Sequence, residues 1–526
     1  MSKKAIAKSA FVVMILTIIS RLVGFFRDQL IALHFGASGV TDAYFVGITF
    51  PNLIVGIFGV AVSTAFLPVF TRMLGVLERR EEAWRMVSSV FSVCAAVGIV
   101  LSAGGMLGAP WLVKLLAPGF SGETYRLAVV TTRIVFPGVL FMIVGLIAKA
   151  TLNSFREFAV PALGPIIQNF VLIAGLVFVV RSGVVGLAVA MLLGMFTQLL
   201  IQIPALVKRG MRYRLTFDIV DPNVWRVGRL ALPIIVGSLA GQSYIMVDRS
   251  LASHLATGSI AALTFADKVR QLPLGLFVAA ITTVLYPSLA DYAAKKDYSG
   301  LQAAVGMGLR LVGLITVPAA VGLAVLRIPV IRLLFERGAF GEMATAQTSA
   351  ALLFYSLSIV ALAANSVLTI TFYGMQDMIT PTLILVGGAV SNIFLDFLLV
   401  EPMGHSGLAL ANSVASFVMT MAFLVALRKK IAGFQLSTVL SSTRKIVISS
   451  IAMAVVAVWA GTYFRIFDGG YGMLQQVTFV GATIAISGAT YGLLALLLGV
   501  EEVQLVVVAV RRKVMSRLST LKRTRS

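Results

Sequence analysis

The chain has 526 residues, of which 59% are hydrophobic and only 12% are charged, and its mean hydropathy is +0.98. Soluble globular proteins carry about 25% charged residues, whereas here the few charges lie between apolar runs long enough to cross about 30 Å of hydrocarbon. The composition therefore excludes the soluble, fibrous and disordered classes and indicates a polytopic membrane protein. A single cysteine, Cys94, excludes a disulfide framework and a cysteine-based metal cluster, and three histidines leave little material for His-rich metal chemistry.

Apolar runs separated by polar breaks predict about fourteen transmembrane helices. The expected spans are residues 8–34, 43–72, 85–108, 126–152, 159–180, 184–207, 226–254, 259–290, 301–326, 345–374, 380–400, 406–427, 446–464 and 475–510. The first of them follows three lysines and is similar to a signal peptide. No small-residue cleavage site follows it, so we expect a retained first helix.

Lysine and arginine are shared unevenly between the two sets of connections. Of the 43 Lys and Arg residues, 28 lie in the connections on the side of the N-terminus and eight lie in the opposite ones. The positive-inside rule therefore predicts that both termini are cytoplasmic. The basic segment 511–526 is expected to act as a topology signal that also attracts anionic membrane lipids. Because the charge is not gathered in one patch, we expect no nucleic-acid partner.

The remaining seven basic residues fall inside or at the edges of apolar spans. A charge at the bilayer centre costs at least about 2.5–3.5 kcal/mol, so such residues normally face a bundle interior or a watery cavity. They are Arg21, Arg27, Lys149, Arg249, Lys268, Arg270 and Arg310. Lys149 and Arg310 lie near predicted cytoplasmic ends, and we expect both to extend to the membrane surface. The other five are candidates for a transport pathway.

The chain also contains an internal repeat with an offset of 219 to 223 residues, in which residues 28–68 parallel 248–287 and Asn169 parallels Asn392. Each copy holds six helices, an even number, so both copies insert with the same orientation, as in transporters that bind substrate near the midplane. The predicted fold is thus an all-α polytopic membrane protein with two parallel six-helix lobes. The expected domains are lobes 1–220 and 221–430, two additional helices in 431–510 and a basic cytoplasmic tail, 511–526.

The first helix carries Arg21, Arg27 and Asp28 at spacings that bring them to one face. Arg21 lies roughly 20 Å along this helix, too deep for its guanidinium to reach the membrane surface easily. An arginine fork matches phosphate oxygens and stays charged in any environment, so the pattern predicts a phosphate clamp. The alternative is that Arg27 and Asp28 form a network that only joins neighbouring helices.

The second repeat carries its own charges, Asp267, Lys268 and Arg270, early in a predicted span. Asp267 and Arg270 are three residues apart and are expected to neutralise each other. Lys268 has no such obvious partner in the sequence and is therefore the better candidate ligand.

A further polar cluster consists of Asn392 and Asp396, four residues apart in one predicted span, with Asn412 in the next. If Asp248 lies close to these three, two carboxylates and the amide oxygens would form a hard-oxygen site for Na⁺, or one carboxylate would hold a proton. The alternative is that Asp248 pairs with an arginine across the bundle.

The sequence supports an enzyme less well than a transporter. The chain contains no Gly-Lys dipeptide, so it has no Walker A loop for ATP. No polar connection is long enough to form a catalytic domain, and the histidines lack Ser or Cys partners in an elbow. The sequence therefore favours a transporter that is not an enzyme and that has no cofactor other than a coupling Na⁺ or proton.

Several motifs together resemble the MurJ (MviN) family of lipid II flippases. They are Ser20-Arg21-Leu-Val-Gly24-Phe-Phe-Arg27-Asp28, Thr41-Asp42-Ala-Tyr-Phe45, Pro51-Asn52-Leu53, Leu152-Asn153-Ser154, Phe158-Ala-Val-Pro161, Ala266-Asp267-Lys268, Leu334-Phe335-Glu336-Arg337-Gly338-Ala-Phe340 and Phe372-Tyr373. The resemblance covers about residues 5 to 430. It implies membership of the multidrug/oligosaccharidyl-lipid/polysaccharide exporter superfamily, fourteen helices, and a lipid-tail groove formed by the last two.

The resemblance also implies roles for individual residues. Arg21, Arg27 and Asp28 match charges that line the family's central cavity, and Asp42 matches its second-helix acid. Asp248, Asn392, Asp396 and Asn412 resemble positions implicated in sodium binding in some members. Lys268 stands where the family usually has arginine. Val55-Gly56, Val60-Ala61 and Ile370 replace polar or charged family residues, so this cavity is less basic than the family pattern.

The expected function is movement of the peptidoglycan precursor lipid II from the inner to the outer leaflet of the bacterial cytoplasmic membrane by alternating access. The expected substrate-binding residues are Arg21, Arg27, Asp28, Asp42, Lys268 and Arg270, with a candidate Na⁺ site at Asp248, Asn392, Asp396 and Asn412. The expected partners are lipid II, membrane lipids and cell-wall synthesis proteins. The alternatives are a flippase or ion-coupled exporter for another polyprenyl-diphosphate glycan or a drug, and a non-transporting cell-wall scaffold.

Overall fold

The computed structural model describes residues 3–75, 80–179, 183–218, 221–431, 436–468 and 470–503, and these residues fold into helices joined by short connections. Twelve helical segments among them are long and apolar enough to cross a membrane, or thirteen when the bent pair Gly122–Val135 and Gly138–Ser154 is counted as one span. The first predicted span lies in the 33-residue helix α1 (Lys3–Phe35), which brings the number close to the predicted fourteen. The prediction of an all-α polytopic membrane protein is confirmed. The predicted basic tail, 511–526, lies outside the described residues.

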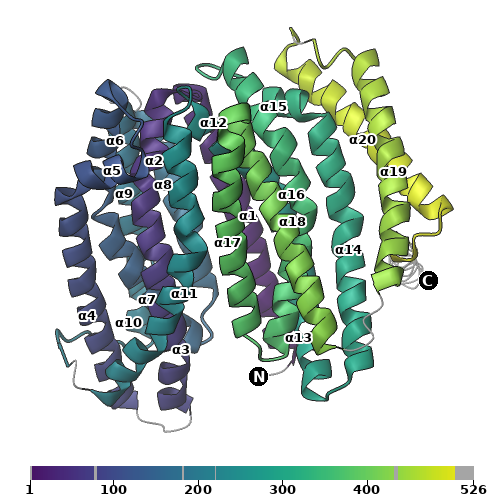
Figure 1. The fold of residues 1–526 in the computed structure, drawn as a ribbon. Helices are drawn as coiled ribbons and strands as arrows, with labels where there is room; N and C mark the ends of the chain where they lie inside the picture. Colours follow the sequence, from purple (N-terminus) through teal and green to yellow (C-terminus); the bar gives the residue numbers. More distant parts are fainter. Residues whose placement is uncertain are drawn as a thin grey trace, which may run out of the picture. The chain divides into compact units, whose positions relative to one another are not determined.

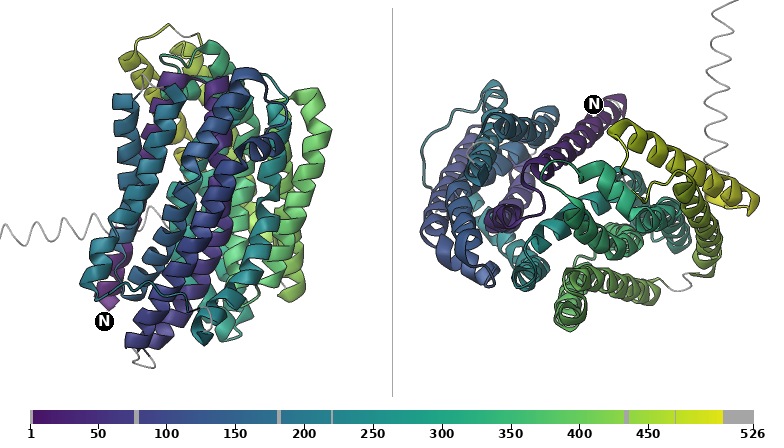
Figure 2. Two further views of the ribbon diagram at one scale, coloured as in Figure 1. Left: turned by 90° about the vertical axis from the view of Figure 1, so that its left-hand side faces the viewer. Right: turned by 90° about the horizontal axis from the view of Figure 1, so that it is seen from above.

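The contacts divide the chain into two units. Unit 1 comprises Met1–Phe265 together with Arg337–Ala344, and unit 2 comprises Ala266–Glu336 together with Thr345–Ser526. The predicted lobes followed the sequence repeat, whereas the units follow packing, and α11 packs against α3 within unit 1. In Figures 1 and 2 the long helices of each unit run side by side, as expected for bundles whose polar backbone must be satisfied inside a membrane.

Unit 1 contains the first eleven α-helices. They are α1, α2 (Gly39–Ile54), α3 (Val60–Gly75), α4 (Arg80–Leu107), α5 (Ala109–Leu116), α6 (Gly122–Val135), α7 (Gly138–Ser154), α8 (Ala159–Val179), α9 (Gly183–Leu200), α10 (Ile203–Lys208) and α11 (Pro222–Ser253). Helix α12 (Ser259–Pro273) begins in unit 1 and continues into unit 2. Helices α6 and α7 meet at a bend of 41° within a single predicted span.

Unit 2 contains the end of α12 and the helices that follow it. They are α13 (Ala279–Ala294), α14 (Tyr298–Val325), α15 (Arg327–Phe335), α16 (Glu342–Gly374), α17 (Ile379–Met403), α18 (His405–Lys430), α19 (Leu436–Tyr463) and α20 (Met473–Leu497). The first three residues of α16, up to Ala344, belong to unit 1.

The sequence repeat is visible in the helix bounds. Two five-residue π-helices, η1 (Val55–Gly59) and η3 (Leu274–Val278), begin 219 residues apart and interrupt corresponding helices of the two copies. Each follows a proline inside the helix, Pro51 or Pro273. Proline removes one backbone hydrogen bond and crowds the preceding turn, which is a recognised cause of local widening of a helix.

The helix α20 and the residues that follow it are joined to α14 by polar contacts inside unit 2, and α19 packs beside α14 (Figure 1). The Tyr491 hydroxyl donates to the Leu314 carbonyl at 2.7 Å. Arg310 pairs with Glu502 at 2.5 Å, and only 1% of the Glu502 side chain is exposed. The expectation that Arg310 extends to the membrane surface was therefore wrong, because a buried carboxylate more than 190 residues away in the sequence holds it inside the unit.

Candidate functional site

In unit 1, the charges of α1 meet a polar side chain of α8. Arg27 donates through Nε and Nη2 to Asp28 Oδ1 at 2.9 and 2.6 Å, and through Nη1 to Asn169 Oδ1 at 2.8 Å. Asp28 is 2% exposed. Gly24 makes this approach possible, since a Cβ at that position would lie 3.3 Å from the Asn169 amide nitrogen. The predicted alternative of an Arg27 and Asp28 network is thus present, and it extends to a neighbouring helix.

Arg21, on the same helix, has no such partners among the described residues. Its side chain is exposed, and it makes no hydrogen bond or ion pair with any residue in the described part of the chain. Ile19 and Leu22, close to it along α1, are also exposed. A guanidinium in such a place keeps its full charge and all its donors available, whereas most donors of Arg27 are already used.

Asp42 on α2 is buried, with 3% exposure, and receives two backbone hydrogen bonds from the start of α12. Its Oδ2 accepts from the Gly258 amide at 2.6 Å, and its Oδ1 accepts from the Ala261 amide at 2.7 Å. The first amides of a helix have no partner within the helix, and they attract negative charge. Asp42 therefore caps α12 from another helix, while its predicted role in substrate binding stays a prediction.

A tight turn from the 337–344 segment inserts into unit 1 near the end of α1. The Ala339 amide donates to the Leu33 carbonyl at 2.9 Å. Gly338 has φ +58°, and a Cβ there would lie 2.4 Å from the Leu33 carbonyl oxygen. Phe340 is fully buried and contacts Phe265 edge to face at 5.6 Å. These contacts give a structural reason for the Arg337-Gly338-Ala-Phe340 motif found in the sequence.

In unit 2, Arg270 is the centre of a polar network, as the i, i+3 spacing of Asp267 and Arg270 predicted. Its Nε donates to Asp267 Oδ1 at 2.9 Å, and its Nη1 donates to Ser358 Oγ at 3.0 Å and Asn412 Oδ1 at 2.6 Å. The guanidinium also lies 4.3 Å from the centre of the Tyr355 ring. Arg270 is therefore neutralised and held in place. Lys268, half-buried on the same helix, also has an interaction partner.

The amides predicted for an ion site are connected to this network. Asn392 Nδ2 donates to Asp396 Oδ2 at 2.5 Å, and Asn412 Nδ2 lies 3.4 Å from Asn392 Oδ1. Asp396 is fully buried and Asn392 is 3% exposed. The Asn412 oxygen accepts from Arg270, so three of the four predicted residues are brought together in unit 2. Asp248 belongs to unit 1, is partly buried and has a partner of its own.

The donor set of this cluster suits a hard monovalent cation or a proton better than a transition metal. Amide and carboxylate oxygens are the ligands that hard cations take. Among the described residues, no three His, Cys, Asp or Glu side chains gather in a way that could hold a metal ion.

Two of the residues that pair with these charges were not predicted from the sequence. Asn169 appeared only as an element of the repeat, although a lone amide in an apolar span needs a partner, and that was a usable signal. Glu502 was given no role, although an acidic residue inside the predicted span 475–510 also needs a partner. Neither pairing partner follows from spacing along the chain.

Repeated helical bundles with charged residues on membrane-spanning helices define the protein as a polytopic transporter. Residues 31–475 match the family model described as lipid II flippase MurJ. A probable lipid II flippase MurJ of Vibrio cholerae is 31% identical over 95% of this chain and 97% of its own length. The lipid II flippase MurJ of Burkholderia cenocepacia is 30% identical over 79% of this chain and 82% of its own length. The chain belongs to the lipid II flippase MurJ family.

Solved structures support the same assignment. A lipid II flippase MurJ in an inward closed conformation is 26% identical, covers 94% of this chain and 100% of its own, and has a TM-score of 0.80. An inward-facing multidrug transporter of the MATE family, within the MOP superfamily, is 16% identical over 80% of this chain with a TM-score of 0.69. This second likeness concerns the fold alone.

Proposed function

We infer that the protein is a flippase that moves lipid II between the leaflets of the bacterial cytoplasmic membrane. The match of residues 31–475 to the family model carries this inference, and near-complete coverage of the Vibrio relative supports it. The likeness to flippases makes transport, rather than catalysis or scaffolding, the activity to test first.

We propose that Arg21 is the principal contact for the diphosphate of the lipid. Its guanidinium is exposed and has no protein acceptor within the described residues, and a guanidinium binds phosphate oxygens bidentately. Arg27 contributes charge from a fixed position, because Asp28 and Asn169 hold it. Lys268, which belongs to unit 2, is proposed as a further ligand from its place in the sequence alone. We propose that Asp28, Asp42 and Arg270, which hold Arg27, the start of α12 and the Asn412 side chain, position these groups rather than bind the lipid.

Release on the other side requires that the transporter hold the diphosphate less tightly in the outward state, since a ligand bound equally in two states shifts neither. We propose that Na⁺ or a proton at Asn392 and Asp396 supplies this bias. A fully buried carboxylate next to an amide is a place where cation binding or protonation changes the local charge strongly. Asn412 joins this pair to Arg270, so a change of charge at Asp396 would alter the hydrogen bonds of Arg270.

The distribution of basic residues and the nature of the lipid support proposals for the orientation and the partners of the protein. Both termini are proposed to be cytoplasmic, because 28 of the 43 basic residues lie on that side. Because lipid II is a peptidoglycan precursor, cell-wall synthesis proteins are proposed partners.

The test is transfer of labelled lipid II in liposomes that contain the purified full chain. Wild type is compared with Arg21→Gln and with Arg133→Gln, an exposed arginine on α6. We expect transfer by wild type and the α6 control, and a loss of at least tenfold in Arg21→Gln. Unchanged transfer by Arg21→Gln would contradict the clamp without contradicting flipping.

Substrate identity is tested in the same liposomes with a different undecaprenyl-diphosphate glycan. Preference for lipid II is expected from the family, and equal transfer of both lipids would show a broader flippase. No transfer of either lipid under a Na⁺ gradient, a pH gradient or a membrane potential would contradict the proposed function and favour a scaffold.

A further inference from the structure

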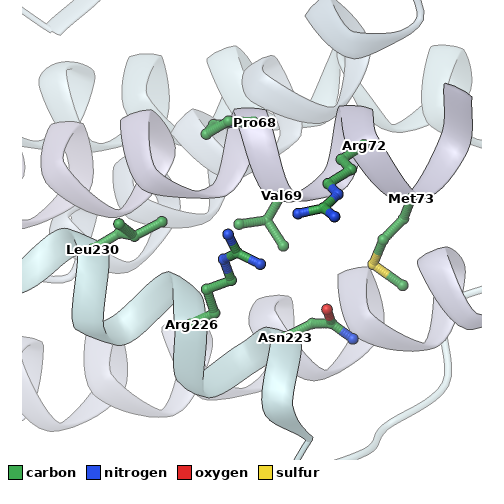
Figure 3. Close-up of a pocket in the computed structure, with 7 residues that line it drawn as sticks. All are labelled: Pro68, Val69, Arg72, Met73, Asn223, Arg226 and Leu230. Atoms are coloured by element: carbon green, nitrogen blue, oxygen red, sulfur yellow. The ribbon is translucent and has the colours of Figure 1, made fainter. Parts of the chain in front are cut away.

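Unit 1 has a second positively charged site, which lies where α3 ends and α11 begins. A cavity of about 310 Å³ is lined by Pro68, Val69, Arg72, Met73, Asn223, Arg226 and Leu230. Figure 3 shows the guanidinium groups of Arg72 and Arg226 extending from the two helices toward the same space beside Val69. A second hollow shares Arg226 and Leu230 with the first and adds Pro222, Trp225 and Arg229.

None of the described residues that line either hollow is acidic. Within the part of the chain that the structure describes, Arg72, Arg226 and Arg229 make no hydrogen bond or ion pair, and all three are exposed. The acid next to the site along α11, Asp221, is engaged otherwise, because its Oδ1 accepts from the backbone and side-chain nitrogens of Asn223 at 2.7 and 3.1 Å. Two guanidiniums that face one cavity repel each other unless an anion lies between them.

The residues around these arginines suit the headgroup of an amphiphile better than a free anion. Trp225 is 63% exposed, and tryptophan is enriched where a membrane meets water. Along α11, the exposed residues Leu232, Val236 and Leu239 continue from Arg229 at helical spacing on the same face. The arginines therefore mark the polar end of an apolar helix face that is long enough to lie along an acyl chain.

We propose that Arg72 and Arg226, with Arg229 beside them, bind the phosphate of an anionic phospholipid in the leaflet at this end of unit 1. Each guanidinium offers a fork of donors to the phosphate oxygens, while Leu230 and the exposed face of α11 lie against the acyl chains. Since α3 and α11 pack together beside the cavity, one bound lipid contacts both helices. The site is separate from the charged groups of α1, so it does not depend on which lipid the protein transports.

Native mass spectrometry of the full chain in detergent tests this site. The protein is titrated with phosphatidylglycerol, phosphatidylcholine, inorganic phosphate and undecaprenyl diphosphate, and three forms are compared. They are wild type, the double variant Arg72→Gln/Arg226→Gln, and a charge-matched control, Arg85→Gln/Arg212→Gln, which changes two exposed arginines that do not line the cavity.

We expect wild type and the control to retain phosphatidylglycerol in preference to phosphatidylcholine, and the Arg72→Gln/Arg226→Gln variant to bind phosphatidylglycerol at least tenfold more weakly. The preference should fall as salt rises, because the contact is ionic. Equal binding by the two double variants would overturn the proposal. Displacement of the phospholipid by inorganic phosphate would show an adventitious anion site, and selective displacement by undecaprenyl diphosphate would assign the site to the transported lipid, so both results would also overturn it.

Discussion

Replacement of Asp42 should loosen the start of α12. The carboxylate accepts from two buried amides, Gly258 at 2.6 Å and Ala261 at 2.7 Å. Hydrogen bonds to a charged group contribute about 1.5–3 kcal/mol each, and a buried donor left without a partner costs about 1–3 kcal/mol. These two ranges describe overlapping parts of one effect. We therefore expect Asp42→Ala to lower the free energy of opening this turn by about 3–4 kcal/mol in total.

A change of 3–4 kcal/mol corresponds to roughly a 10²–10³-fold larger opening equilibrium for this turn. Asp42→Asn keeps one oxygen acceptor but loses the charge, so we expect about half that free-energy change. Hydrogen exchange measured by mass spectrometry on peptides covering residues 254–266 reports this opening directly. Exchange should rise in the order wild type, Asp42→Asn, Asp42→Ala.

Asn52→Ala provides the matched control, since Asn52 lies on the same helix but is exposed. It should leave exchange of residues 254–266 unchanged. If Asp42→Ala exchanged within twofold of wild type while the protein remained folded, Asp42 would not hold α12, and the two short hydrogen bonds would carry no net stability.

Three further predictions follow from contacts elsewhere in the structure. Glu502→Gln should lower the thermal unfolding midpoint, because a broken buried ion pair costs about 3–5 kcal/mol. The double variant Arg310→Met/Glu502→Leu should unfold at a temperature closer to that of wild type. If both variants lowered the midpoint equally, packing and not charge would determine stability at this pair. Gly338→Ala should destabilise unit 1, since its φ is +58° and its Cβ would lie 2.4 Å from the Leu33 oxygen, while Gly341→Ala, with open space around it, should be neutral in the same assay. Burial opposes charge on Asp377, but hydrogen bonds from Lys430 and Thr380 outweigh it and lower the pKa of Asp377 to about 2 from 3.8. The stability contributed by this contact is complete above about pH 4 and is lost as pH falls toward 2, so pH-corrected hydrogen exchange near residue 377 should rise over that range in wild type but not in Asp377→Asn.

The spans were predictable because each needs only a long apolar run, and the repeat was predictable because its copies keep their order along the chain. The π-helices were not. Pro51 and Pro273 each precede one, but Pro165 inside α8 and Pro318 inside α14 lie in helices that continue without such a segment. Whether a proline widens the next turn depends on what packs around it, and that information is not local.

Among the candidate sites, too, some contacts could be predicted from the sequence and others could not. The Asp267 and Arg270 pair could be predicted, since three residues along a helix place the two side chains together. The contact between Arg27 and Asn169 joins residues 142 positions apart. It depends on Gly24, which lets α8 approach α1 at that level. Sequence spacing predicts contacts within one helix, whereas contacts between helices require the packing itself.

This difference separates two arginines that the sequence treats alike. Arg21 and Arg27 lie in one helix and one motif, yet Arg27 has acceptors at 2.6 to 2.9 Å in Asp28 and Asn169, and Arg21 has none among the described residues. A charge with fixed partners contributes the same field whether or not a ligand is present, because its position does not change. A charge without partners gains most when an anion arrives, and a site that must bind a diphosphate and later release it needs at least one group of that second kind.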